Sequence, residues 1–284
     1  MKLGVSSYSF HQRISKGEMT AMDALEAAKE MGFDGIEFVD FNLPKENTAE
    51  YAAELKKRAE EIGIEICCYS VGAQLIQETE EETRAEIERV KKQIDIAAAL
   101  GVKIMRHDAF FQLKKYLSFD LCLPELGEIC RELSKYAEQY GIRTTIENHG
   151  YICQGSDRVE KIFNAVNYPN FGLLTDIGNF RCVDEDSAHA VAVVAPYTIH
   201  AHIKDFKIYD YADKDKAEGG FQSRACNVLA GAAAGDGDIP VEQCIDILKR
   251  VGYDDYLVLE YEGAQDCMEG IKRGFDFVSD ILNK

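Results

Sequence analysis

Residues 58–70, RAEEIGIEICCYS, contain the end of an amphipathic helix, a glycine and a short β-prone run, in that order. The glycine, Gly63, stands where a helix would end in the left-handed conformation that glycine adopts at the least cost. Four other stretches share this construction: AAKEMGFDGIEFV (27–39), IAAALGVKIMRH (96–107), AEQYGIRTTIENH (137–149) and LKRVGYDDYLVLEY (248–261). A phrase that occurs five times indicates a repeated unit of one helix and one strand.

The spacing of these helix-ending glycines gives the length of the unit. Gly32, Gly63, Gly101 and Gly141 are separated by 31, 38 and 40 residues. Gly252 follows Gly141 after 111 residues, which is three further units of 37. We therefore expect two more units between these last two glycines.

Eight strands and eight helices follow from this unit. Besides the strands in the five phrases, β-prone runs lie at 3–10, 171–180 and 198–206. Apolar residues at three- and four-residue spacing predict helices over 20–31, 48–62, 79–100, 123–140, 156–167, 187–195, 240–251 and 266–282. Eight strand–helix units predict a closed (β/α)8 TIM barrel, a single α/β domain over residues 1–284. The alternative is an open doubly wound sheet, but no Gly-rich phosphate turn follows the first strand.

The composition limits the partners and the environment of the protein. The chain has 284 residues, with 32 Lys and Arg against 50 Asp and Glu, and a formal net charge of −18. This balance disfavours nucleic acids and anionic membranes, because binding to phosphates needs clustered Lys and Arg. The first ten residues lack the pattern of a signal peptide, and no apolar run is long enough to span a bilayer. Nine cysteines without a Cys-x-x-Cys motif suggest reduced thiols in a cytoplasmic protein.

Strong metal ligands stand at the ends of four consecutive predicted strands: Glu147, Asp176, His202 and Glu260. A charged residue inside a strand is costly unless it is paired, and a cation between these four would compensate them. Three carboxylates and one imidazole favour Mn²⁺ or Mg²⁺, with Co²⁺ as a further option, over a zinc site rich in thiolates. The alternative is that each residue is only solvated at the barrel mouth. Four such residues at matching depths on adjacent strands count against this alternative.

Five phrases around these residues make the chain resemble the xylose isomerase-like superfamily of sugar and sugar-phosphate isomerases and epimerases. They are IENHG (146–150), LLTDIGN (173–179), HAHIKD (200–205), GDGDIP (235–240) and LVLEYEG (257–263). The resemblance covers the whole chain. It implies one divalent metal ion with Glu147, Asp176, His202 and Glu260 as its ligands.

The resemblance also implies a mechanism. In the related isomerases and epimerases, the cation chelates two adjacent oxygens of a hydroxy-ketone, which acidifies the C–H between them and holds a cis-enediolate. Two glutamates on opposite sides of the substrate exchange protons with carbon. In this chain the catalytic pair would be Glu147 and Glu260, which are also metal ligands. Asp176 and His202 would be mainly structural ligands.

Three residues near the predicted ligands are candidates for substrate binding. His149 shares a strand face with the metal-ligating glutamate two residues before it, and would bind a substrate hydroxyl or brace that glutamate. Lys204 lies beyond the metal-ligating histidine and is placed to bind a substrate oxygen. Glu37 ends the strand in 27–39 and has a similar position. The alternative for His149 is a strand histidine whose hydrogen bonds are satisfied within the fold.

Two further candidates depend on details that the sequence leaves open. His107 ends the strand in 96–107 and is expected to contact substrate, although Arg106 or Asp108 would project there if the register differs by one residue. Arg224 lies in the connection after 198–206, where a flexible residue would close over a sugar. The alternative for Arg224 is an exposed side chain that is only solvated.

Two features depart from the simple pattern. Many relatives have a histidine three residues after the metal-binding aspartate, where this chain has Asn179, a residue that carries no proton at neutral pH. Substrate identity therefore does not transfer from the histidine-bearing members. The connection over about 205–240, in particular Tyr209 to Asp238, is long for a compact domain, and such loops are commonly lids. We expect it to fold over the barrel mouth.

The sequence leaves several functions open. The leading hypothesis is a metal-dependent isomerase or epimerase of a ketose or related sugar or polyol. The main alternative is a lyase on the same scaffold, such as an inosose dehydratase or the barrel subunit of a C-glycoside-cleaving enzyme, because the first proton transfer is shared. A barrel that binds a sugar or a protein without catalysis is the third hypothesis. Six histidines and the acidic charge disfavour an abasic-site endonuclease.

We expect the partner to be a small carbohydrate. No glycine motif that cradles a phosphate is visible, which favours a substrate without a phosphate group. Relatives are often dimers or tetramers, so a homo-oligomer stays an open expectation.

Overall fold

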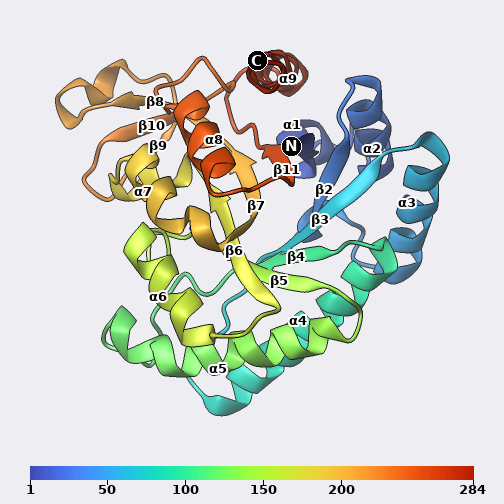
Figure 1. The fold of residues 1–284 in the computed structure, drawn as a ribbon, viewed down its shortest axis with the longest axis vertical. Coiled ribbons are helices and arrows are strands. Elements are labelled where there is room, and N and C mark those ends of the chain that lie inside the picture. Colours follow the sequence, from blue (N-terminus) through green and yellow to red (C-terminus); the bar gives the residue numbers. More distant parts are fainter.

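The computed structural model describes residues 1–284 and contains a closed barrel of eight parallel strands (Figure 1). The barrel strands are β1 (Lys2–Ser6), β2 (Gly35–Val39), β3 (Glu65–Val71), β4 (Ile104–His107), β5 (Arg143–Glu147), β6 (Phe171–Asp176), β7 (Thr198–Ile203) and β11 (Tyr256–Leu259). Neighbours in this order are paired, and β11 pairs with β1 to close the ring. The prediction of a (β/α)8 TIM barrel is confirmed.

Eight helices surround the barrel, each after one of its strands. They are α2 (Ala21–Glu30), α3 (Thr48–Ile62), α4 (Glu80–Leu100), α5 (Phe119–Glu138), α6 (Ser156–Val166), α7 (Ser187–Val194), α8 (Val241–Arg250) and α9 (Cys267–Leu282). A short α1 (His11–Ile14) and five 3₁₀ turns fill the connections. The start of α5 differs from the prediction, which placed it at residue 123, because Pro124 lies inside the helix and not at its first turn.

The glycines that defined the repeat act as expected. Gly63 and Gly101 terminate α3 and α4 with φ values of 71° and 78°. Gly32, Gly141 and Gly252 also have positive φ. Each therefore occupies the left-handed region that favours glycine, which lets the chain leave a helix and enter the next strand.

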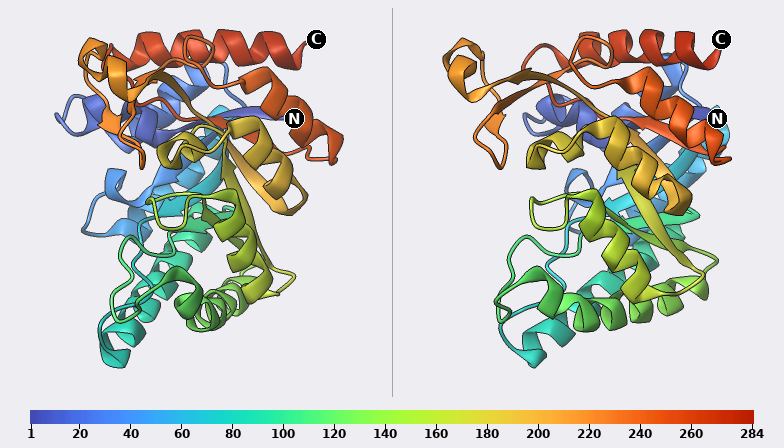
Figure 2. Two further views of the ribbon diagram at one scale, coloured as in Figure 1. Left: turned by 90° about the vertical axis from the view of Figure 1, so that its left-hand side faces the viewer. Right: turned by 60° about the vertical axis from the view of Figure 1, so that its left-hand side comes forward.

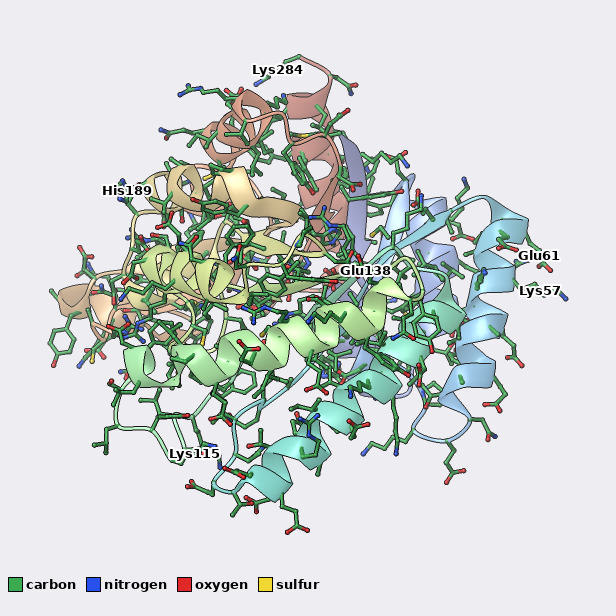
Figure 3. All side chains as sticks on the ribbon, turned by 60° about the horizontal axis from the view of Figure 1, so that its bottom comes forward. Lys57, Glu61, Lys115, Glu138, His189 and Lys284 are labelled. Carbon is green, nitrogen blue, oxygen red and sulfur yellow. The ribbon has the colours of Figure 1, made fainter.

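The apolar faces of the helices pack on the barrel, while their outer faces carry charge. One cluster of 72 buried residues forms the main core. Figure 3 shows Lys57 and Glu61 of α3 and His189 of α7 projecting away from it, and all three are exposed. No helix is both long enough and apolar enough to cross a membrane.

The connection after β7 forms a small sheet where the sequence predicted a loop. Antiparallel strands β8 (Asp205–Tyr209), β10 (Val228–Ala232) and β9 (Phe221–Gln222) pair in that order, and the 3₁₀ turn η5 (Tyr211–Lys216) lies between β8 and β9. The Asp205 carboxylate accepts hydrogen bonds from the backbone N–H groups of Gly235, Gly237 and Ile239. These bonds tie the end of the connection after β7 to its start. Figure 2 shows this sheet at the same end of the barrel as the loops that follow β4 and β5.

Candidate metal centre

Four ligand-type side chains converge at the carboxyl ends of adjacent barrel strands. Glu147 ends β5, Asp176 ends β6, His202 lies in β7 and Glu260 directly follows β11. One ligand atom from each lies within 4.8 Å of the others. The parallel register places Asp176 beside His202. Asn148 fixes β5 against β6 through two hydrogen bonds with the backbone of Asp176, of 2.8 and 2.9 Å.

The donor set and its buried negative charges fit one divalent cation. Asp176 Oδ2 and His202 Nδ1 are buried and make no hydrogen bond of good geometry, although Lys204 Nζ lies 3.1 Å from Asp176 Oδ2. His202 Nδ1 lies 2.7 Å from Glu260 Oε2 and 3.8 Å from Glu147 Oε1. Three carboxylates gathered in one buried space repel one another, and a cation between them and the imidazole would compensate their charge. The structure therefore brings together the four residues predicted as ligands in a geometry suited to a metal ion.

Glu37 determines which nitrogen of His202 faces the other ligands. Its Oε2 lies 2.9 Å from His202 Nε2 and 3.2 Å from His200 Nε2, and its Oε1 accepts a hydrogen bond from Ser6. Burial would raise the pKa of Glu37, but the two histidines outweigh it and hold the pKa well below its usual value. With Nε2 occupied by this carboxylate, Nδ1 is left to bind a cation. Glu37 was expected to contact substrate; in the structure it pairs with two histidines and also lines the cavity over the cluster.

Asn179 contacts two residues of the cluster and Lys204 beside it. Its side-chain Nδ2 donates to Glu147 Oε1 at 2.8 Å, and its backbone N–H donates to Asp176 Oδ1 at 3.0 Å. Its Oδ1 accepts from Lys204 at 3.2 Å. The residue that the sequence singled out only as a departure from the family pattern thus orients a predicted catalytic carboxylate.

Lys204 supplies a positive charge against the carboxylates. Its Nζ lies 3.1 Å from Asp176 Oδ2, 3.5 Å from Glu260 Oε1 and 3.4 Å from Glu262 Oε2. Burial would lower the pKa of Lys204, but these acids raise it well above its usual value. For Glu260 the directions are reversed: burial would raise its pKa, but Lys204 and His202 lower it to about 2. Lys204 therefore stays charged and Glu260 ionised at neutral pH.

Arg106 faces the site, whereas His107 does not. Arg106 Nη2 lies 2.6 Å from Glu147 Oε2, 2.7 Å from Asp108 Oδ1 and 3.1 Å from His149 Nδ1. The His107 ring is fully buried with Nδ1 3.0 Å from the Asp108 carbonyl, and burial lowers its pKa to about 4. Side chains alternate along a strand, so only one of these neighbours points into the barrel. The register that the sequence left as an alternative is the one observed.

His149 and Arg224 occupy different positions around the barrel mouth. His149 Nδ1 lies 2.9 Å from Asp108 Oδ1, and the ring lines the cavity over the cluster. Burial would lower the pKa of His149, but Asp108 outweighs it and raises the pKa. Arg224 is exposed and donates to the backbone carbonyl of Tyr151. It therefore braces a loop and does not line the cavity.

The cluster opens into a cavity of about 230 Å³. Charged side chains form much of its wall, including Arg106, Lys204 and Glu262. Tyr8 and Phe41 add two aromatic faces. Convergent polar groups beside a few apolar surfaces are typical of a small-molecule site.

The comparison with protein-family models decides the family. The model of the xylose isomerase-like TIM barrel matches residues 25–281, which is most of the chain. The chain belongs to the xylose isomerase-like TIM barrel family. The resemblance inferred from the sequence is thereby confirmed.

Two relatives of this xylose isomerase-like barrel are a dehydratase and an epimerase, and a third protein of similar structure binds zinc. An inosose dehydratase of Glaesserella parasuis is 25% identical over 231 residues, which cover 74% of each chain. The L-ribulose-5-phosphate 3-epimerase UlaE of Escherichia coli K12 is 22% identical over 280 residues, or 93% of this chain and 90% of the relative. A crystal structure of the IolI protein with a zinc atom superposes with a TM-score of 0.77 at 19% identity, covering 100% and 98% of the two chains.

Sequence reasoning did not assign three residues that shape this xylose isomerase-like site. Arg106 was named only as a register alternative, and Asn179 only as a departure. Glu262 was not considered, although it follows Glu260 by two residues and alternate side chains of an extended segment point the same way. The alternation of side chains was the signal for Arg106 and Glu262, but contacts of Asn179 depend on the turn after β6.

Proposed function

We propose that this chain is a divalent-metal-dependent enzyme that transfers a proton at the carbon beside the carbonyl of a keto sugar or related polyol, as an isomerase or epimerase. The observation that carries the proposal is the cluster of Glu147, Asp176, His202 and Glu260, whose ligand atoms lie within 4.8 Å of one another. The named epimerase and dehydratase relatives support the same class of chemistry.

The four clustered residues would hold one divalent ion. Carboxylate-rich sites suit Mn²⁺ or Mg²⁺, and Co²⁺ is a further option. The zinc atom in the IolI structure makes zinc another metal to test. When bound, the ion supplies Lewis acidity that makes the C–H beside a carbonyl easier to deprotonate.

The residues of the chain supply the proton transfer. One of Glu147 and Glu260 would remove a proton from the carbon beside the carbonyl. In an isomerase the proton would be returned to the neighbouring carbon, and in an epimerase the other glutamate would protonate the opposite face of the same carbon. Arg106 and Asn179 fix the two oxygens of Glu147, at 2.6 and 2.8 Å. Lys204 keeps Glu260 ionised, so it enters the reaction as a base. His149 is placed to contact a substrate hydroxyl from the cavity wall.

A lyase is the second candidate function. The inosose dehydratase relative favours it, because elimination of water starts from the same proton abstraction. In that case Glu147 or Glu260 would remove the proton, and an acid in the cavity would protonate the departing hydroxyl. We further propose that the substrate is a small carbohydrate and that the protein binds neither nucleic acid nor membranes. We also propose that it works in the cytoplasm as a homo-oligomer.

Deuterium exchange tests the proposal and separates the two candidates. Protein loaded with Mn²⁺, Mg²⁺, Co²⁺ or Zn²⁺ is incubated in deuterated water with ketoses, 3-keto sugars and inososes, and followed by NMR. Deuterium beside the carbonyl with an isomeric sugar supports an isomerase or epimerase, whereas loss of water or of an aglycone supports a lyase. Glu147→Gln should abolish exchange, and the exposed control Glu30→Gln should not. Exchange that is absent with every metal and sugar would overturn the proposal.

A further inference from the structure

The cavity over the metal centre continues outward into a larger one. The inner cavity has a volume of about 230 Å³ and the outer about 650 Å³. They adjoin because four residues line both: Tyr8, His149, Lys204 and Glu262. The outer volume lies in the range of pockets that bind small molecules. A single sugar ring held at the carboxylate cluster would leave this space without a ligand group.

Three partly exposed aromatic side chains stand around the outer cavity. They are Phe111 after β4, Tyr151 after β5 and Phe221 in β9. Their exposed fractions are 43%, 41% and 36%. Exposed apolar surface gathered around one cavity marks a binding site, and aromatic rings favour ligands with a flat apolar face.

The aromatic wall is fixed in place by contacts between loops. A Cβ at Gly150 would lie 2.6 Å from the Phe111 ring, so the loops after β4 and β5 pack closely there. Tyr151 has a φ of 60°, an uncommon conformation for a residue other than glycine. Its hydroxyl donates to the Gln222 carbonyl at 2.7 Å, and Arg224 donates to its carbonyl. The strained tyrosine is thus tied to the small sheet, as expected of a residue held for binding.

The charges around both cavities favour a neutral ligand. Apart from the predicted metal ligands, Lys204 Nζ lies 3.4 Å from Glu262 and Arg106 Nη2 lies 2.7 Å from Asp108. His149 is paired with Asp108. Recognition of a phosphate needs donors that are free to bind its oxygens, and each of these cations is already paired with an acid.

We propose that the outer cavity binds a second ring attached to the keto sugar, so that the substrate class is a neutral keto-sugar glycoside. This inference rests on the proposed function, which puts the keto sugar at the carboxylate cluster. The second ring stacks on Phe111, Tyr151 and Phe221 through a flat apolar face. A pyranose and an aromatic aglycone both present such a face, and the probes below distinguish them.

The test compares methyl, phenyl and glucosyl 3-keto-β-glucosides as ligands of the Mn²⁺-loaded protein by calorimetry. The phenyl or the glucosyl probe should bind about tenfold more tightly than the methyl probe, as expected for one good aromatic contact. A gain for phenyl alone identifies an aromatic aglycone, and a gain for glucosyl alone a second sugar. Equal affinities, or no binding of either larger probe, would overturn the inference.

Matched variants locate the effect. Phe111→Ala and Phe221→Ala should each remove most of the gain, and Phe221→Ala, at a residue that lines only the outer cavity, should leave the affinity for the methyl probe unchanged. Tyr211→Ala is the control, because Tyr211 is a 59% exposed aromatic of the same small-sheet segment that lines neither cavity. A gain that survives both phenylalanine variants contradicts the second-ring site.

Deuterium uptake from the methyl probe separates this inference from the proposed function. Metal-dependent exchange without a gain for the larger probes refutes the second ring alone. A gain in binding without exchange from these probes supports the second-ring site, and the proposed function is then refuted separately if the wider panel of metals and sugars also shows no exchange.

Discussion

At the scale of single residues, the predicted metal ligands are oriented by side chains that are not ligands themselves. Glu37 holds His202, and Asn179 holds Glu147, each through one hydrogen bond within 3 Å. Residues in this position commonly influence metal affinity or activity almost as strongly as the ligands. The two contacts make different predictions, because one acts on a structural ligand and the other on a catalytic carboxylate.

Glu37→Gln should weaken metal binding. The amide keeps the size of the carboxylate but loses the negative charge that attracts His200 and His202. The His202 ring is then held less firmly in the orientation that points Nδ1 toward the cation. We expect the Kd for Mn²⁺ to rise by roughly 10- to 100-fold. Calorimetric titration of the metal-free protein measures this, with Glu30→Gln as an exposed control of the same chemistry. An unchanged Kd in a folded Glu37→Gln protein would show that this hydrogen bond does not orient the ligand.

Asn179→Ala should slow catalysis more than it weakens metal binding. Removing the amide frees Glu147 Oε1 and leaves Lys204 without one of its acceptors. Misplacing a catalytic group costs up to about 100-fold in rate, and we expect a loss of about tenfold or more in kcat. The deuterium exchange rate at saturating Mn²⁺ measures it, and Asn283→Ala at the exposed end of α9 is the control. Wild-type kcat in Asn179→Ala would refute this positioning role.

At the scale of elements, helices α4 and α5 are joined by a shared ion pair. Glu132 of α5 lies 2.6 Å from Arg84 and 2.8 Å from Lys91, both in α4. Burial would raise the pKa of Glu132, but hydrogen bonds from these two residues lower it below its usual 4.5. The depressed pKa means that the pair stabilises the fold above pH 4.5. This contribution is lost as the pH falls through the lowered value.

Glu132→Gln should therefore destabilise the protein slightly at pH 7 and less in acid. The side chain is 35% exposed, so solvent screens the pair and the loss should be only about 0.5 kcal/mol. Urea unfolding at pH 7 and below pH 4 measures the difference from wild type. A difference that grows as the pH falls would contradict the sign.

The same scale shows why the elements were largely predictable. Helix ends were marked by glycines such as Gly63 and Gly101, whose positive φ the sequence pattern indicated directly. The small sheet after β7 was not predicted, because β9 has only two residues and its pairing with β10 is not encoded locally. Whether Arg106 or His107 points into the barrel depends on a shift of one residue along β4. Hydrophobic patterning does not resolve this shift, because the strand is buried on both faces.

At the scale of the whole molecule, the closed barrel brings four distant strand ends to one point and loops from β4, β5 and β7 to one cavity. The order of the eight strands makes Glu147, Asp176, His202 and Glu260 neighbours, so their clustering was predictable once the barrel was. The outer cavity was not, because its walls join Phe111, Tyr151 and Phe221 across loops whose packing no local pattern specifies. The proposed chemistry follows from the first set, and the proposed substrate class from the second.

The measurement that tests the central claim most directly is the stoichiometry of Mn²⁺ bound to the chelator-treated protein, read from the EPR signal of the free ion. Wild type should bind one ion per chain, and Asp176→Asn should lose it while keeping the helical circular dichroism spectrum. Asp246→Asn, the same substitution at an exposed position of α8, should bind like wild type. Wild type without a bound ion, or Asp176→Asn binding as tightly as wild type, would contradict the account.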